Sequence, residues 1–166
     1  MSLDNIELPA FILQDLFKNS LVHLDGRENI PSSKPGSSLN FLGGNRSKIT
    51  ILVENASVTF LSDQELLFLT GILSACKFTL EDIGLVNLYK TPAINYQQIL
   101  EQLAPKKILM LGVSPKIINL PFDIPLFQVQ KFDGCIYLCA PTLAELENDR
   151  NAKKQLWLKL QEIFEI

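Results

Sequence analysis

Apolar and polar residues follow two distinct patterns beyond residue 48. Near-continuous apolar runs occupy residues 49–53, 85–89, 107–113 and 135–139, and such runs are typical of strands buried on both faces of a parallel sheet. Residues 126–131 instead alternate between apolar and polar side chains, which predicts an edge or half-exposed strand. We therefore expect four or five strands in this part of the chain.

Helical periodicity predicts helices at residues 62–76, 95–103 and 142–166, the last with a break near residues 148–149. Ser62 and Glu65 have the spacing of a capping box, in which each side chain binds a backbone N–H of the first turn. Thr142 and Glu145 repeat this spacing. The helix that begins at Ser62 is apolar around most of its circumference, so we expect it to be heavily buried.

The alternation of strands and helices predicts an α/β fold. We expect a three-layer α/β/α sandwich whose central, mostly parallel sheet has four or five strands, because parallel neighbours need helical crossovers. Ligands of such sheets bind at the carboxyl ends of the strands. The loops after residues 53, 89, 113 and 139 are therefore where any chemistry is expected.

The first 47 residues follow a different pattern. Residues 1–24 predict an N-terminal helix with apolar positions at helical spacing, among them Phe11, Ile12, Leu16 and Phe17. Residues 25–47 are rich in Gly, Pro and Ser and predict a linker or long loop, in which Gly43 and Gly44 suggest a hinge. Residues 48–166 form the α/β domain. The apolar helix face either packs on this domain or binds a partner in a groove.

Composition and charge narrow the classes of function. The chain has 166 residues, of which 47% are hydrophobic and 20% charged, as in soluble globular proteins. No apolar run approaches the roughly 18–20 residues that span a bilayer, and the N-terminus lacks a signal-peptide pattern, so we expect a cytoplasmic protein without membrane contact. The net charge of −3 gives no support for binding a nucleic-acid backbone directly.

Few residues are suited to catalysis or metal binding. The single histidine, His23, lies in the N-terminal helix, far in sequence from any nucleophile of the α/β domain. The three cysteines have apolar flanks and no CxxC pair, which indicates core packing: Cys76, Cys135 and Cys139. Gly112 and Lys116 follow a strand, but neither GxGxxG nor GxxxxGK[ST] is present. We expect no catalytic set, metal or cofactor.

The segment after the last predicted strand carries a more specific pattern. A Pro-x-Leu-x-x-Leu run is followed by a polar break, then by Ala-Lys and Leu-Trp, and its members are Pro141, Leu143, Leu146, Ala152, Lys153, Leu156 and Trp157. This pattern resembles the C-terminal signature of the psi subunit family of bacterial DNA polymerase III. The resemblance extends loosely over residues 48–166. Asp149 and Arg150 depart from it, because family members often carry Asn-Pro there.

The resemblance implies a uracil-DNA glycosylase-like fold without glycosylase activity. It also implies a non-catalytic adaptor that links the clamp loader to accessory proteins in DNA replication, with protein subunits of that complex as partners. The N-terminal segment would attach to the clamp loader, although it is longer and more helical than the family pattern. Trp157 is expected to pack in the core or to anchor an interface.

Two alternatives stay open. One is a glycosylase-like or phosphoester hydrolase of the same fold that uses the loops at Glu54 and Ser114. The other is a structural interaction protein with no role in nucleic-acid metabolism. The groups usually needed for base excision are missing, since the loop after the last strand has no histidine and Glu54 has no obvious acidic partner.

Overall fold

The computed structural model describes residues 39–91 and 93–166 of the chain. The predicted N-terminal helix, with Phe11, Ile12, Leu16 and Phe17, and residues 25–38 of the predicted linker lie outside this part. Their predicted roles in partner binding therefore stay predictions.

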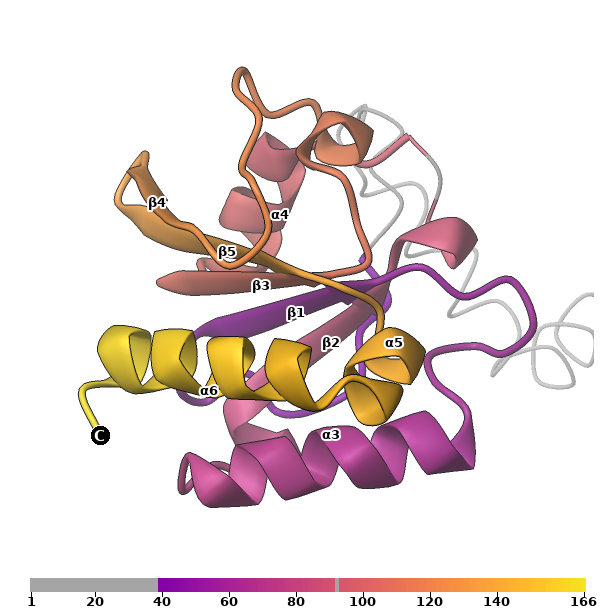
Figure 1. Cartoon of the computed structure of the whole chain (residues 1–166). Coiled ribbons are helices and arrows are strands. Elements are labelled where there is room, and N and C mark those ends of the chain that lie inside the picture. The colour runs from indigo at the N-terminus through magenta and orange to yellow at the C-terminus, as the bar shows by residue number, and fades with distance from the viewer. Residues whose placement is uncertain (1–38, 92) are drawn as a thin grey trace, which may run out of the picture. The chain divides into compact units, whose positions relative to one another are not determined.

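A five-stranded mixed sheet forms the centre of the α/β unit (Figure 1). Its strands are β1 (Ile49–Val53), β2 (Ile83–Asn87), β3 (Lys107–Leu111), β4 (Val129–Phe132) and β5 (Cys135–Ala140). They lie in the order β2-β1-β3-β5-β4. The first four in this order are parallel, while β4 runs antiparallel to β5 at the edge. The predicted mostly parallel sheet is confirmed, and β4 is the predicted half-exposed strand.

Helices cover both faces of this sheet, which gives three layers (Figure 1). One face carries α3 (Asp63–Ala75), α5 (Leu143–Asn148) and α6 (Arg150–Phe164), and the other carries α4 (Tyr96–Leu103) with the short 3₁₀ helix η4 (Pro115–Ile118). Alternate strand residues point to opposite faces, so Ile51 and Val53 join the cluster under α3 and α6, while Leu52 joins the cluster under α4. The three-layer prediction is confirmed.

The predicted helix starts and the break are also confirmed. Ser62 with Glu65, and Thr142 with Glu145, form complete capping boxes at α3 and α5. Asp149 separates α5 from α6, and its carboxylate caps the second helix. These signals succeed because a cap needs only residues close in sequence.

The second strand begins earlier than its apolar run suggests. It starts at Ile83 rather than at residue 85, directly after the 3₁₀ helix η2 (Leu80–Asp82). It ends at Asn87, whose side chain accepts a hydrogen bond from the backbone N–H of Tyr89 and starts the 3₁₀ helix η3 (Leu88–Lys90). The shift arises because β2 pairs over its whole length with β1, and this partner sets the ends of the strand.

Residues 42–47 lie against β2 and the turn before it instead of forming a free linker. Leu42 and Leu85 exchange two backbone hydrogen bonds of 2.8 Å. Gly43 has a φ of +113°, and a Cβ there would lie 2.3 Å from the carbonyl oxygen of Ile83 and 2.4 Å from that of Leu80. Gly43 is thus needed for a close backbone approach and is no hinge. The α/β unit accordingly begins about ten residues before the predicted boundary at residue 48.

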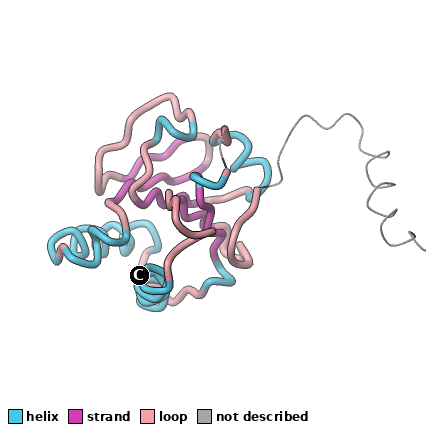
Figure 2. The backbone as a smooth tube through the Cα atoms, turned by 90° about the vertical axis from the view of Figure 1, so that its right-hand side faces the viewer, coloured by secondary structure: helices cyan, strands magenta, loops and turns pink. Residues whose placement is uncertain are grey.

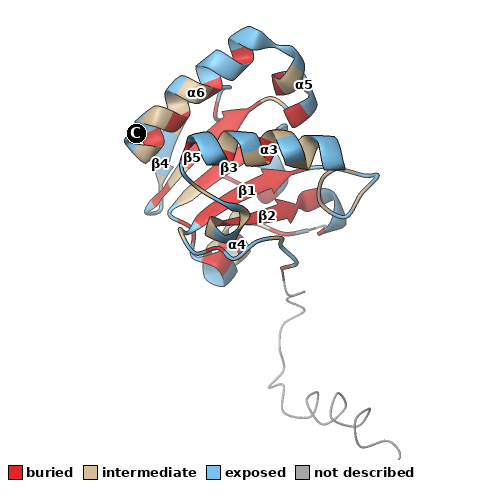
Figure 3. Cartoon of the chain, turned by 90° about the horizontal axis from the view of Figure 1, so that it is seen from below, coloured by how far each residue is buried: buried red, intermediate tan, exposed pale blue. Residues whose placement is uncertain are grey.

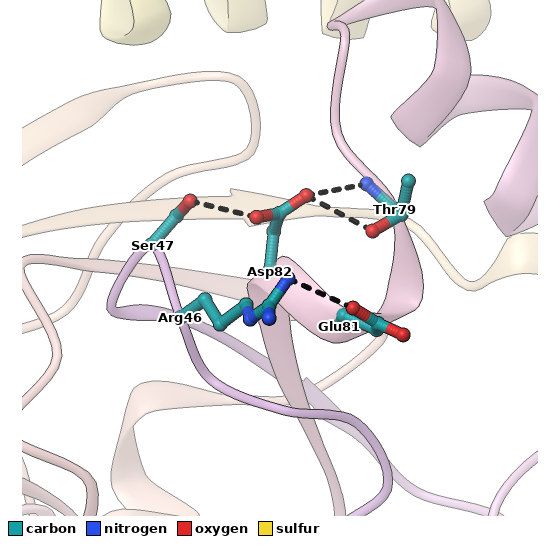
Figure 4. Close-up of polar contacts among 5 residues, drawn as sticks. All are labelled: Arg46, Ser47, Thr79, Glu81 and Asp82. Carbon is teal, nitrogen blue, oxygen red and sulfur yellow. Dashed lines mark hydrogen bonds and ion pairs between the residues drawn. The ribbon is translucent and has the colours of Figure 1, made fainter.

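Polar side chains hold the same segment to the turn before β2 (Figure 4). The Asp82 carboxylate accepts hydrogen bonds from the backbone N–H and the hydroxyl of Thr79, at 2.8 and 3.0 Å, and from the Ser47 hydroxyl at 3.2 Å. Arg46 forms an ion pair of 2.9 Å with Glu81. The hydrogen bonds from Thr79 hold the pKa of Asp82 below its ordinary value. The β2 edge is therefore covered by chain that the sequence places in a linker.

Candidate functional site

The carboxyl ends of β3 and β5 border a hollow of about 1090 Å³. Figure 2 views the unit from this end of the sheet, where loops surround the strand ends. The polar residues of its lining are Ser114, Lys116, Asp123, Thr142, Glu145, Asn148 and Asp149. We call this hollow, together with the loops after β1 and β2, the strand-end region. It is the place where an enzyme of this fold class would bind its substrate.

Two of the three acidic side chains of the hollow, those of Glu145 and Asp149, serve as helix caps. Glu145 accepts hydrogen bonds of 3.0 Å from the backbone N–H and from the hydroxyl of Thr142. Asp149 accepts from the backbone N–H groups of Asn151 and Ala152 at 2.9 and 3.2 Å. A carboxylate at this position occupies the end of α6 that would otherwise attract an anion. The N-terminus of α6 is therefore unsuited to holding a phosphate.

The predicted glycine after β3 also has a structural explanation. Gly112 has a φ of +69°, and a Cβ there would lie 2.3 Å from the Cγ2 atom of Thr142. Lys116, which follows this glycine in the same loop, lies 3.5 Å from the carboxylate of Asp123. Gly112 is thus needed for the approach of the α5 N-terminus, and Lys116 already has an acidic neighbour. The geometry therefore supports a plain strand-to-loop turn better than a phosphate-binding loop.

A buried carboxamide organises the loop after β1. Asn87 is 1% exposed, and its Nδ2 group donates to the carbonyl oxygens of Asn55, Val58 and Thr59 at 2.8, 3.1 and 3.1 Å. Its Oδ1 atom accepts from the backbone N–H groups of Asn55 and Tyr89 at 3.0 and 3.1 Å. Asn87 is not among the residues that the sequence patterns single out. The available signal was one amide side chain at the end of an apolar strand.

The two residues of the hydrolase alternative lie in different parts of the strand-end region. Ser114 lines the hollow, whereas Glu54 does not. Glu54 is exposed. Its neighbour Asn55 donates a hydrogen bond of 3.2 Å to Glu65, which links the loop to the capping box of α3. The geometry therefore shows a loop tied to the fold, with one exposed carboxylate beside it.

The cysteines are poor nucleophiles in this fold. All three are buried and free, which confirms the prediction of core packing. Burial raises the pKa of Cys135 to about 12 and that of Cys139 to about 11, so both thiols stay protonated near neutral pH. Within residues 39–91 and 93–166, no three His, Cys, Asp or Glu side chains lie together as a metal site would require.

A second concave surface lies between α3 and α6, on the outside of the unit. It encloses about 400 Å³ and is lined by Leu67, Phe68, Gly71, Ile72, Ala75, Lys153, Leu156, Trp157 and Leu160. We call it the α3–α6 groove. Figure 3 shows that both helices turn buried positions toward the sheet and exposed positions outward. Except for one lysine, the groove is lined by apolar residues and glycine.

The prediction that α3 is heavily buried is wrong. Within the helix only Leu69 and Leu73 are buried, and Leu67 is 75% exposed. The reason is the layered architecture, because an outer helix has only one flank against the sheet. No described element covers the opposite flank of α3, although it carries apolar side chains.

The structure divides the signature residues between the core and the groove. Leu143, Leu146, Ala152 and Leu156 belong to the buried cluster on the α3–α6 face, and Pro141 is half-buried beside the hollow. Lys153 and Trp157 line the groove, where the Lys153 ammonium lies 5.6 Å from the ring centroid of Phe68. Trp157 is half-buried, so it packs on the core and also presents surface.

No protein-family model matches this chain, and no curated protein shows significant sequence similarity to it. The described residues include no helix with the length and apolar character needed to cross a membrane.

Proposed function

We propose that this protein is a cytoplasmic, non-catalytic adaptor that acts by binding other proteins. The α3–α6 groove is the observation that carries the proposal. It exposes apolar side chains of two helices, including Leu67 and Trp157, on a unit whose core is already complete on both faces of the sheet. Exposed apolar concavities of this kind are typical of protein-binding surfaces.

The strand-end region supports the same proposal. Glu145 and Asp149 cap helices, Asn87 fastens a loop, and Lys116 lies beside an acidic partner. General acid–base or nucleophilic catalysis needs side chains that are free to contact a substrate and to exchange protons with it. Here the polar groups that surround the hollow are engaged in maintaining the local fold.

The proposal extends to a role like that of the psi subunit of DNA polymerase III. The adaptor would link the clamp loader to accessory proteins in DNA replication through protein contacts, on a uracil-DNA glycosylase-like fold. The signature residues Lys153 and Trp157 support this role, because both contribute to the exposed groove. The net charge of −3 favours protein over nucleic acid as the direct partner.

Affinity capture tests this proposal. The full chain is immobilised in native extract of its own organism, and the bound proteins are quantified by mass spectrometry against an unrelated acidic bait. We expect enrichment of clamp-loader or accessory subunits of the replication machinery. Recovery of no replication subunit, with the bait shown to be folded by circular dichroism, would contradict the replication role.

The hollow itself favours one second candidate, a glycosylase-like or phosphoester hydrolase. Its volume of about 1090 Å³ is enough for a nucleotide-sized ligand, and Glu54 provides an exposed carboxylate on a neighbouring loop. Cleavage of uracil-containing DNA or of a model phosphoester that disappears in Glu54→Ala or Ser114→Ala would establish it. No cleavage by the unsubstituted chain above a blank, or cleavage that is unchanged in both variants, would eliminate it.

A further inference from the structure

Gly71 is the one glycine within a helix of the described residues, and it lines the α3–α6 groove. A glycine inside a helix costs about 1 kcal/mol relative to alanine. At Gly43 and Gly112 a close neighbour explains the missing side chain, but a Cβ at Gly71 would meet no atom within 4 Å. The described fold therefore gives no steric reason for glycine here. The missing side chain leaves open space on this part of the groove.

The spacing around Gly71 suits a third helix. Leu67, Gly71 and Ala75 follow one another every four residues on α3, so they form a row with a large residue at one end and small residues beyond it. A helix of another protein can settle between such a row and the neighbouring α6, because ridges of side chains pack into grooves between rows. Trp157 on α6 provides the opposite wall.

The charge of the groove indicates which charged side chain the partner helix has. Lys153 is the one charged residue of the lining, and no ion pair joins it to a carboxylate among the described residues. Its ammonium lies near the Phe68 ring, at the border of the apolar surface. An acidic side chain on the edge of an apolar helix face would complement it.

We propose that the α3–α6 groove binds one amphipathic helix of a partner protein, which lays apolar side chains across Gly71 and places an Asp or Glu beside Lys153. This inference rests on the proposed adaptor function and states the chemistry of the partner. A second copy of the chain fits less well. A two-fold interface apposes the same patch of both copies, which would bring two Lys153 side chains together without an acid between them.

A model helix tests the inference without knowledge of the natural partner. The probe is a fluorescein-labelled peptide of about 20 residues, long enough to be helical in water. It has leucines at positions i, i+3, i+4 and i+7 and one flanking glutamate. Its anisotropy is measured with the full chain. A second peptide replaces the glutamate by lysine, and a third has the same composition in scrambled order.

Three variants locate the binding. We expect Gly71→Leu to lower the affinity for the glutamate peptide at least about tenfold, because the leucine side chain fills the groove. Leu67→Ala removes an exposed apolar side chain from the lining, and it should lower the affinity about fivefold. Leu158→Ala is the matched control, because Leu158 is a 54% exposed leucine on α6 that lies outside the lining. It should leave the affinity unchanged. Circular dichroism confirms that each variant is folded.

A charge exchange tests the role of Lys153. Lys153→Glu should lower the affinity for the glutamate peptide several-fold and raise the affinity for the lysine peptide by a similar factor. Only a direct pairing of the two charges explains such an exchange. Equal binding of the ordered and scrambled peptides, or unchanged binding to Gly71→Leu, would overturn the proposal. These results are separate from the capture experiment, because the groove can bind helices even if the natural partner has no role in replication.

The other occupants are distinguished by two further measurements. Sedimentation of the full chain that shows a dimer, lost in Gly71→Leu, would identify a second copy as the occupant and overturn the proposal. Full chain carrying Phe17→Asp that binds the peptide about tenfold more tightly would identify the N-terminal segment as a competitor, with the same consequence. A monomer whose peptide affinity is unaffected by Phe17→Asp supports an external partner.

Discussion

The strand-end region and the α3–α6 groove are two concave regions of this unit, and they differ in whether their side chains already bind a neighbour in the fold. The strand-end region has many polar side chains, and most of those described above already bind a neighbour in the fold, whereas Glu54 is exposed. The groove has one charged side chain, Lys153, and apolar residues that stay exposed. Size alone would point to the hollow, since it encloses about 1090 Å³ against about 400 Å³.

Whether a side chain is already bonded within the fold indicates what a surface can do better than the size of a cavity does. A polar group satisfied within the fold contributes to stability, and using it for a ligand would cost its structural bond. An exposed apolar group has the opposite balance, because covering it releases water and is favourable. Substitutions in the strand-end region should therefore change stability, and substitutions in the groove should change binding.

The largest effect is expected at Asn87. Asn87→Ala removes the amide that serves three carbonyl oxygens and two N–H groups of the surrounding loops. Unsatisfied buried groups cost about 1–3 kcal/mol each, so we expect the free energy of unfolding to fall by about 3 kcal/mol in urea titrations. Asn148→Ala is the matched control, because the single bond from its side chain to Ala144 is exposed, and it should cost less than about 0.5 kcal/mol.

The next prediction concerns the thiols. Cys139, on the border of the hollow, has a pKa raised by burial to about 11, so it is protonated at pH 8 in the folded chain. Alkylation needs the thiolate and access, and we expect iodoacetamide to react about a hundredfold more slowly with the folded than with the urea-unfolded chain. Fast reaction of native Cys139 would instead mark the hollow as a site of nucleophilic chemistry.

The same shift in pKa gives a pH dependence of stability. The thiol of Cys139 ionises near its ordinary value of 9.0 in the unfolded chain but only near 11 in the fold. Its contribution is therefore complete below pH 9 and is lost as the pH rises toward 11. Denaturant titrations between pH 8 and 11 measure this loss of stability. The loss should be smaller in Cys139→Ala, which lacks the thiol.

A smaller effect on stability is expected at Gly112. Gly112→Ala places a methyl group against Thr142 in a left-handed backbone conformation, and we expect a cost of about 2 kcal/mol. Gly134 offers a matched control. Its φ of +73° is similar, but a Cβ there meets nothing within 4 Å, so Gly134→Ala should cost only about 1 kcal/mol. Equal costs would show that the contact with Thr142 is unimportant.

The smallest effect has the opposite sign and belongs to the groove. Gly71→Ala should raise the free energy of unfolding by about 0.5–1 kcal/mol, because alanine favours the helix and its methyl group has open space. Thermal unfolding followed by circular dichroism measures the gain. A loss of stability would show that Gly71 has a structural role in the isolated chain, and it would remove one support of the docking proposal.

The local elements of this protein are encoded in short stretches of the chain. The capping boxes at Ser62 and Thr142, the helix break at Asp149 and the apolar runs of the strands depend on residues close in the chain, and each is confirmed. The burial of Cys76, Cys135 and Cys139 followed from their apolar flanks. The three-layer class followed from the order of the elements, because parallel strands require crossovers.

Which of these residues remain exposed and free to bind another molecule depends on packing between distant parts of the chain. Leu42 pairs with Leu85, and Asn87 binds carbonyl oxygens about thirty residues before it, so their roles depend on distant partners that a local pattern does not name. The apolar circumference of α3 predicted burial, yet its exposure depends on whether another layer covers the outer flank, and none does among the described residues. Periodicity identifies an apolar helix face, but a covering element, or its absence, is a property of long-range packing.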